Sequence, residues 1–175
     1  MSPEITLTPE QPQEDAFLFE LYATTRAAEL ALIEWNDEQR CAFLRQQYEV
    51  RRFHYLRYHS GAEYLLIRRG GEPIGRIAIH RMEDELRIMD IALVPEYRSM
   101  GIGSQLIHEL LVEASFENTP VTLHVERRNR AAGLYQRLGF RVIEDGAVYL
   151  FLKWVPESHL QPSLNTNINQ RFHAI

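Results

Sequence analysis

Cysteine and long apolar runs are both scarce in this chain of 175 residues. Cys41 is the single cysteine, so neither a disulfide within the chain nor a cysteine-based metal cluster can form. No apolar run approaches the roughly 18 residues of a membrane-spanning helix, and the first fifteen residues lack the basic-then-apolar pattern of a secretory signal. We therefore predict a cytoplasmic protein with no membrane partner and no bound metal.

Positive charge is also in deficit, because 19 lysine and arginine residues face 24 aspartate and glutamate residues, a net charge of −5. A nucleic-acid-binding domain normally carries a basic patch or stripe, so no nucleic-acid partner is predicted. Arginines do gather at residues 51–57 and again at residues 127–130. We interpret both groups as solvated surface.

Hydrophobic periodicity predicts a single α/β domain on a mixed sheet, over residues 1–155. The polar, aperiodic residues 156–175 are interpreted as a flexible C-terminal extension. The expected strands span 4–8, 62–69, 73–80, 85–94, 120–126, 140–145 and 147–154, and the expected helices span 13–32, 35–59, 101–116 and 129–140.

The strand at 85–94 is apolar on both faces, which predicts a central position with cover on both sides. Strict alternation places Leu86 and Ile88 on one face of this strand and Ile91 and Leu93 on the other.

Glycine is sparse as well, with nine residues, yet Gly101 and Gly103 both lie between that strand and an amphipathic helix. Side chains here would block an approaching phosphate, and the unpaired amides of a helix start attract anions. No GxxxxGK[ST] string exists, and a GxGxxG string fails because Leu106 stands at its last position. What remains is Arg-x-x-Gly-x-Gly from Arg98, which predicts an anion-binding loop.

A second motif, "NRAAGLYQRLGF", begins 26 residues beyond Gly103 and follows a strand. Together the two motifs resemble motifs A and B of the GNAT superfamily of N-acetyltransferases, over about residues 85–145. The order of the flanking elements agrees with that family across roughly residues 4–154. The resemblance implies a single-domain GNAT-like α/β fold, with a central mixed, mostly antiparallel sheet flanked by helices on both faces.

The resemblance also implies acetyl-CoA as cosubstrate. Its pantetheine arm would pair, like an added strand, with the main chain of Ile91, Ala92 and Leu93. Asn129 precedes the motif B tyrosine by six residues instead of the usual seven, so it is either a cofactor contact or the N-cap of its helix. The pyrophosphate would lie on the loop amides of Arg98, Ser99, Met100, Gly101, Ile102, Gly103 and Ser104.

Tyr135 occupies the position of the family's catalytic acid, which protonates the leaving CoA thiolate. Helical spacing places Ala131, Leu134 and Leu138 on the core face of its helix. The same spacing leaves Tyr135 on the flank of that face.

The general base stays open between four side chains. An amine is mostly protonated at neutral pH, so a group must remove a proton directly or through water. Asp90 is a carboxylate inside an apolar strand, and His124 and Glu126 share one face of the strand beside the expected cofactor groove. Glu29 lies at the end of the first helix, where the family usually builds its acceptor site. A water chain is the remaining alternative.

The acceptor amine is expected between the first two helices and the nearby loops. Acidic residues there suit a cationic amine, whereas the neighbouring arginines suit an anionic group on the substrate. We predict an N-acetyltransferase that acts on a primary amine of a small molecule, peptide or protein, the alternative being a non-catalytic acyl-CoA-binding regulatory module. A homodimer is left open. The aromatic and charged residues of this region are Tyr22, Arg26, Glu29, Trp35, Tyr48, His54, Tyr55 and Tyr58.

Overall fold

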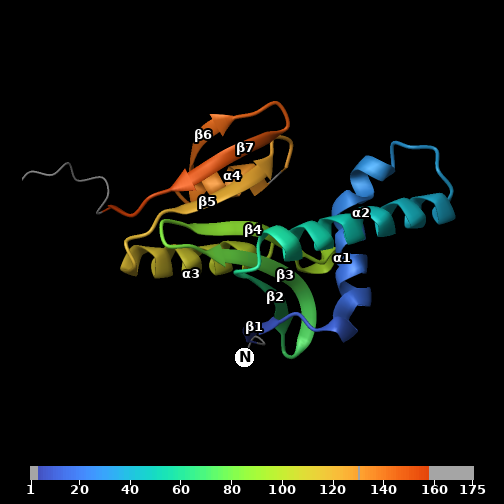
Figure 1. The fold of residues 1–175 in the computed structure, drawn as a ribbon, viewed down its shortest axis with the longest axis horizontal. Coiled ribbons are helices and arrows are strands. Elements are labelled where there is room, and N and C mark those ends of the chain that lie inside the picture. Colours follow the sequence, from blue (N-terminus) through green and yellow to red (C-terminus); the bar gives the residue numbers. More distant parts are fainter. Residues whose placement is uncertain (1–3, 130, 158–175) are drawn as a thin grey trace, which may run out of the picture.

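The computed structural model describes residues 4–129 and 131–157 (Figure 1). Every helix and strand expected from the sequence is present, in the expected order and with ends within three residues. Two short 3₁₀ turns, Pro12–Glu14 and Pro95–Tyr97, were not expected. The strands are β1 (Ile5–Pro9), β2 (Ala62–Arg69), β3 (Glu72–Arg81), β4 (Leu86–Leu93), β5 (Val121–Glu126), β6 (Arg141–Asp145) and β7 (Tyr149–Trp154), and the helices are α1 (Asp15–Leu30), α2 (Asp37–Tyr58), α3 (Ile102–Phe116) and α4 (Ala131–Arg137).

The seven strands form one sheet in the order β1-β2-β3-β4-β5-β7-β6. The pair β4 and β5 is parallel, and each other neighbouring pair is antiparallel. The crossover between the parallel pair is α3, because parallel neighbours need a long connection. The predicted mixed, mostly antiparallel sheet is therefore confirmed.

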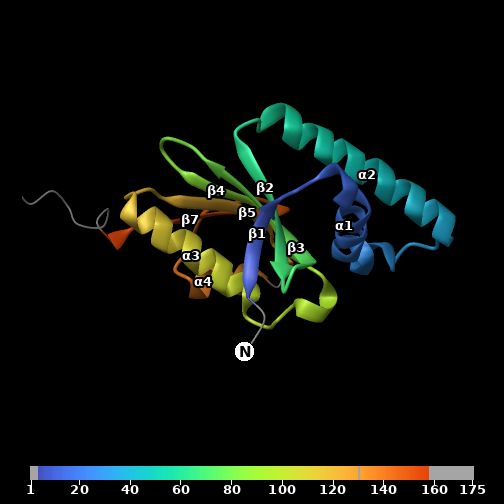
Figure 2. The same cartoon turned by 90° about the horizontal axis from the view of Figure 1, so that it is seen from below.

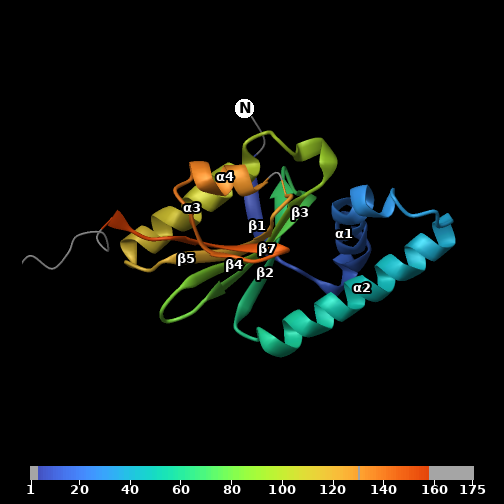
Figure 3. The ribbon, with the colours of Figure 1, turned by 90° about the horizontal axis from the view of Figure 1, so that it is seen from above.

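Helices cover both faces of the sheet, as Figures 2 and 3 show: α3 and α4 lie on one side, and α1 and α2 lie on the other. Consecutive residues of β2 demonstrate both interfaces. Leu66 packs in a cluster with residues of α1 and α2, whereas Ile67 packs in the larger cluster that includes the buried face of α3. Both are fully buried, as expected for a strand covered on two sides.

Helix α2 buries far fewer apolar side chains than α3 does. Asn36 caps α2 with a capping box, its side chain accepting from the amide of Gln39 at 2.8 Å. Along its 22 residues, however, α2 buries only Leu44 and Tyr48. This long helix therefore covers the sheet mainly with polar and half-buried side chains.

The strict alternation expected in β4 is wrong after Ile88. In the pairing with β3, Ala78 lies opposite Asp90 while Ile79 lies opposite Ile88, so Met89 is an extra, unpaired residue. Such a β-bulge shifts the side-chain alternation by one position. Ile91 and Leu93 consequently pack against the same core cluster as Ile88, and Asp90 turns to the opposite face.

Gly75 of β3 allows the end of β4 to approach closely, opposite Leu93. An added Cβ would lie 2.3 Å from the carbonyl oxygen of Ala92, which is backbone and cannot yield easily. We expect Gly75→Ala to lower the free energy of unfolding by about 2–3 kcal/mol in urea denaturation. Gly133→Ala is the control, because its Cβ would meet only the mobile end of Arg137 and alanine favours the helix. Equal effects of the two substitutions would contradict this account of Gly75.

Pro156, the first residue of the expected C-terminal extension, is buried. The domain therefore includes at least this residue. Residues 158–175 lie outside the described part of the chain, so the extension stays a prediction.

Two kinds of feature are absent from the part of the chain that the structure describes. No helix there is both long and apolar enough to cross a membrane. No group of three or more histidine, cysteine, aspartate or glutamate side chains in the same residues is placed to hold a metal ion.

Candidate functional site

The centre of the candidate site is a split between β4 and β5. Their pairing ends at Ile88 and Leu123, although β4 continues to Leu93 and β5 continues to Glu126. On their outer edges β4 is held by β3 and β5 by β7, and no further pairing joins β4 to β5 within residues 4–129. The inner edge of β4, where residues 91–93 were expected to receive pantetheine, is thus open to an extended ligand.

The glycine loop lies at the end of β4 and leads into α3. Ser99 has a φ of 60° and Gly101 a φ of 84°, so the chain turns twice through the left-handed region before the helix begins. The first helical bond runs from the amide of Gln105 to the carbonyl of Gly101 at 2.9 Å. The amides of residues 102–104 therefore start α3 without an intrahelical acceptor, and Gly101 has no side chain to cap them.

Gly103 has no structural need to be glycine. Its backbone φ is not in the left-handed region, and an added Cβ would meet only Cδ1 of Ile91 at 3.9 Å, an ordinary contact. Glycine costs roughly 0.5–1 kcal/mol relative to alanine inside a helix. A bare backbone here is therefore explained by a group that approaches from outside, and the free amides and helix dipole fit the phosphates of acetyl-CoA.

Arg98 anchors this loop. Its Nε donates to the carbonyl of Leu93 at 2.7 Å, and its Nη2 donates to Oγ1 of Thr24 in α1 at 2.6 Å. Its amide donates to the carbonyl of Pro95 at 3.2 Å. Arg98 thus joins the loop to β4 and α1, while Ser99, Met100 and Gly101 are exposed.

Tyr135 is the buried residue of α4, with 6% of its surface exposed. The expectation that it lies on the flank of the core face is wrong, because the two-turn α4 directs it inward against Phe140, edge to face at 5.7 Å. Burial, and then the negative charge of Asp90, raise the pKa of Tyr135 to about 12. Its hydroxyl therefore stays protonated at neutral pH and is available as a hydrogen-bond donor.

Asp90 is held by two arginines on the α1 and α2 side of the sheet. Its Oδ2 lies 2.8 Å from Nη2 of Arg51 and 3.6 Å from Nη1 of Arg76, and its side chain is 19% exposed. The interpretation of Arg51 as solvated surface is wrong. Arg51 shares a stripe of α2 with Tyr48 and Tyr55, at spacings of three and four residues, and this spacing could have placed it on the inner face.

Removal of the charge of Asp90 should leave Arg51 and Arg76 half-buried without a full counter-charge. We expect Asp90→Asn to lower the free energy of unfolding by about 2–4 kcal/mol, measured by urea denaturation at neutral pH. Glu49→Gln is the control, because this α2 carboxylate pairs with Arg45 only at 3.9 Å and is exposed. A loss for Asp90→Asn no larger than that of the control would refute the ion-pair role.

The structure brings Glu29 and Glu126, two of the four candidate bases, to the same arginine. Arg26 of α1 lies 2.8 Å from Glu29 and 4.0 Å from Glu126 at the end of β5, so the arginine bridges the two elements. His124 stands apart from this group, because its ring stacks on Phe151 of β7 at 4.7 Å.

Asn129 caps the short helix of motif B. Its Oδ1 accepts a hydrogen bond from the amide of Ala131 at 2.9 Å, and its carbonyl accepts from Ala132 at 3.0 Å. These hydrogen bonds are of the kind that an N-cap residue makes, and a contact with the cofactor stays a prediction.

Three of the expected acceptor-site aromatics surround one cavity of about 200 Å³ beneath α2: Tyr22, Tyr48 and Tyr55. Trp35 instead packs on Phe43 at 5.1 Å. The rings of His54 and Tyr58 contact each other in a tilted arrangement, with centroids 4.7 Å apart, and neither residue lines the cavity. Sequence reasoning missed the cavity-lining residues that come from the strands and the β1–α1 connection, which are Glu10, Gln11, Pro12, Tyr64 and Arg76.

The acetyltransferase (GNAT) family profile matches residues 27–140, about two thirds of the chain. This span contains the split, the glycine loop and Tyr135.

Curated relatives and solved structures agree with this match. The chain is 33% identical over 92 residues to a putative [ribosomal protein bS18]-alanine N-acetyltransferase of Bacillus subtilis, covering 51% of this chain and 60% of the relative. It is 26% identical over 92 residues to the [ribosomal protein bS18]-alanine N-acetyltransferase of Haemophilus influenzae, covering 51% of this chain and 63% of that protein. The matches thus span less than two thirds of these relatives.

Among solved structures, the PaiA N-acetyltransferase of Thermoplasma acidophilum in complex with coenzyme A is similar in fold. The TM-score is 0.65 at 18% identity, covering 87% of this chain and 99% of that one. The predicted fold class is therefore confirmed, and the expected acyl-CoA-dependent transferase with acetyl-CoA as cosubstrate is confirmed for the family. The chain belongs to the acetyltransferase (GNAT) family.

Proposed function

We propose that this chain transfers the acetyl group of acetyl-CoA to a primary amine. The observations that support the proposal are the split between β4 and β5, the open glycine loop that follows β4, and a buried Tyr135 whose pKa is raised by burial and by the charge of Asp90 in β4. The curated relatives are named as alanine N-acetyltransferases of a ribosomal protein, so a protein N-terminal amine is one acceptor class to test.

Acetyl-CoA supplies an activated acetyl group as a thioester and leaves as a thiol. The amides of residues 102–104 and the start of α3 would hold its phosphates, and the inner edge of β4 would receive the pantetheine arm. Both are preformed parts of the fold, which reduces the ordering cost of binding.

Tyr135 would donate its phenolic hydrogen to the leaving sulfur. A thiol has a pKa of about 8.5, well below that of Tyr135 at about 12, so full proton transfer from the phenol is uphill. Tyr135 therefore acts mainly by stabilising the developing thiolate through a hydrogen bond, as the leaving bond breaks.

Glu126 is the proposed acceptor of the amine's proton, directly or through water. Its contact with Arg26 at 4.0 Å is longer than that of Glu29 at 2.8 Å, so the Glu126 carboxylate is less engaged by the arginine. Asp90 is a positioning residue, because two arginines already hold its carboxylate.

The test is a turnover assay with the purified protein, acetyl-CoA and a panel of amines that includes alanine-initiated peptides, polyamines and amino acids. We expect thiol release that depends on an amine, together with the mass of the acetylated product. Binding of acetyl-CoA without transfer to any amine would contradict the proposal and would favour the non-catalytic acyl-CoA-binding module instead.

The cytoplasmic location, the absence of nucleic-acid and membrane partners and the homodimer stay predictions. The edge strand β6 is exposed throughout, including Val142 and Ile143, which is the feature a dimer through the closing strands would use. Light scattering on the purified protein measures the oligomeric state directly.

A further inference from the structure

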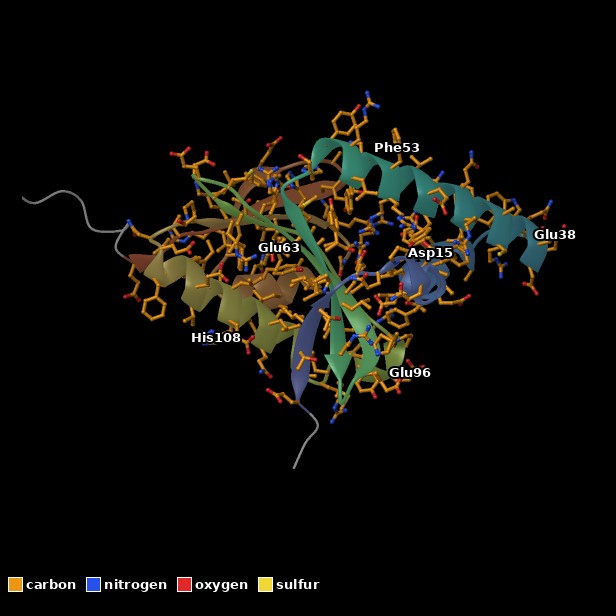
Figure 4. The ribbon with its side chains drawn as sticks, turned by 60° about the horizontal axis from the view of Figure 1, so that its bottom comes forward. Asp15, Glu38, Phe53, Glu63, Glu96 and His108 are labelled. Carbon is orange, nitrogen blue, oxygen red and sulfur yellow. The ribbon has the colours of Figure 1, made fainter. Side chains whose placement is uncertain are left out.

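The cavity beneath α2 combines apolar and aromatic side chains with charged ones, where apolar packing alone would be the ordinary solution. Its volume of about 200 Å³ leaves room for roughly six molecules at the 30 Å³ share of liquid water. Three arginines line it: Arg51 and Arg52 from α2, and Arg76 from β3. Figure 4 shows Asp15 on α1 where that helix meets α2, and Phe53 on the outer side of α2.

The lining arginines have hydrogen-bonding capacity to spare. A guanidinium has five N–H donors, and the contact of Arg52 with Oδ1 of Asp15 at 2.7 Å uses one of them. The buried Nε of Arg76 already forms an ion pair with Oε1 of Glu10 at 2.9 Å, so the spare donors are the remaining N–H groups of the lining guanidiniums. Unfilled donors at a cavity wall favour an oxygen-rich, anionic ligand.

The carboxylates at the cavity do not cancel this preference. Asp15 is already bound by Arg45 and Arg52 and accepts from the hydroxyl of Tyr48 at 3.0 Å. Burial raises the pKa of Glu10, which favours its neutral form more than in water. Asp90 does not line the cavity, and its carboxylate is paired with Arg51.

The tyrosines argue against a cationic ligand. Aromatic rings bind cations through their faces, but here those faces already carry arginine. Arg51 lies over the rings of Tyr22 and Tyr55, at 5.6 and 5.1 Å from their centroids, and Arg76 lies 5.9 Å from that of Tyr64. The chain's own guanidiniums occupy the positions that a polyamine would need.

Arg51 connects this cavity to the split, because it binds Asp90, whose charge reaches Tyr135. We propose that the cavity binds a carboxylate of the acceptor, so that the substrate is a small amine that also carries a carboxylate group. The inference rests on the proposed function and names its acceptor class. An amino acid fits the volume, and its anionic group would lie on the arginines with its amine on the side of Arg51 and Asp90.

The experiment compares free L-amino acids with their α-carboxamides as acceptors. Each pair keeps the same side chain and amine, and a neighbouring carboxylate makes the amine the stronger base, so less of it is unprotonated at neutral pH. Without a carboxylate site the amides would therefore be the better acceptors. We expect kcat/KM to be at least about tenfold higher for the best free acid than for its amide. Equal values, or preference for the amides throughout, would overturn the inference.

Arg52→Gln and Arg57→Gln form the matched pair of variants. Arg52 lines the cavity, whereas Arg57 lies on the same helix over the exposed ring of Phe53. We expect Arg52→Gln to lower kcat/KM for the free acid about tenfold or more while changing that for the amide less than twofold. Arg57→Gln should change neither. An unchanged acid preference in Arg52→Gln would also overturn the inference.

A further test uses a carboxylic acid that has the side chain of the best acceptor but no amine. It shows whether the carboxylate in the cavity belongs to the acceptor or to a separate effector. Competitive inhibition of this compound against the amine supports an acceptor site. Activation or noncompetitive inhibition would assign the cavity to a separate effector and overturn the inference. Failure of acetyl-CoA to bind defeats the proposed function. Acetyl-CoA binding without Arg52-dependent binding of any amino acid, measured by calorimetry, defeats only the cavity inference.

Discussion

Gly103→Trp is expected to weaken acetyl-CoA binding at least about 100-fold, a loss of about 2.7 kcal/mol, without unfolding the protein. Nothing in the protein's own structure requires glycine at this position, since an added Cβ meets only Ile91 at 3.9 Å. A large side chain would therefore project toward the space in front of the amides of residues 102–104. Isothermal titration with acetyl-CoA gives the affinity, and thermal melting gives the stability.

His108→Trp is the matched control, because His108 lies on the exposed side of the same helix (Figure 4). It should retain the affinity of the unmodified protein. Gly103→Ala should give an intermediate affinity with a melting temperature at or above the original. Full binding by Gly103→Trp, or an equal loss in His108→Trp, would mean that the loop is not the phosphate site.

Tyr135→Phe is expected to lower kcat about 100-fold or more while leaving the dissociation constant for acetyl-CoA within about twofold. Phenylalanine preserves the edge-to-face packing on Phe140 and removes only the hydroxyl. Steady-state kinetics with a saturating amine, combined with calorimetry, separates the two quantities. A fall in affinity with unchanged kcat would make Tyr135 a binding residue instead of a catalytic one.

The pKa of Tyr135 adds a pH signature. Because burial raises that pKa from 10 to about 12, the phenol stays protonated as the pH rises through 10. Deprotonation of Tyr135 should therefore reduce kcat only above about pH 10–11. An alkaline loss of kcat centred near pH 8, absent from the residual activity of Tyr135→Phe, would contradict this assignment.

The element order could be predicted because each element carries its own periodicity and boundary residues. The buried stripe of α3 and the capping of α2 by Asn36 are local features of this kind. The bulge at Met89 could not be predicted, since it exists only in the register between β3 and β4. One inserted residue then reversed the face of Asp90, which decides what that carboxylate contacts.

The candidate site was predictable in its loop and not in its charge network. Gly101 and Gly103 belong to one continuous motif, whereas Arg51 and Arg76 reach Asp90 from elements far apart in the sequence. The burial of Tyr135 likewise depends on where the two-turn α4 sits, which its seven residues cannot specify.

A crystal structure of the protein grown with coenzyme A tests the central claim most directly. The account predicts coenzyme A in the split between β4 and β5, with its pyrophosphate at the amides of residues 102–104 and its thiol within hydrogen-bonding distance of the Tyr135 hydroxyl. Coenzyme A bound outside the split, or a thiol directed away from Tyr135, would contradict it.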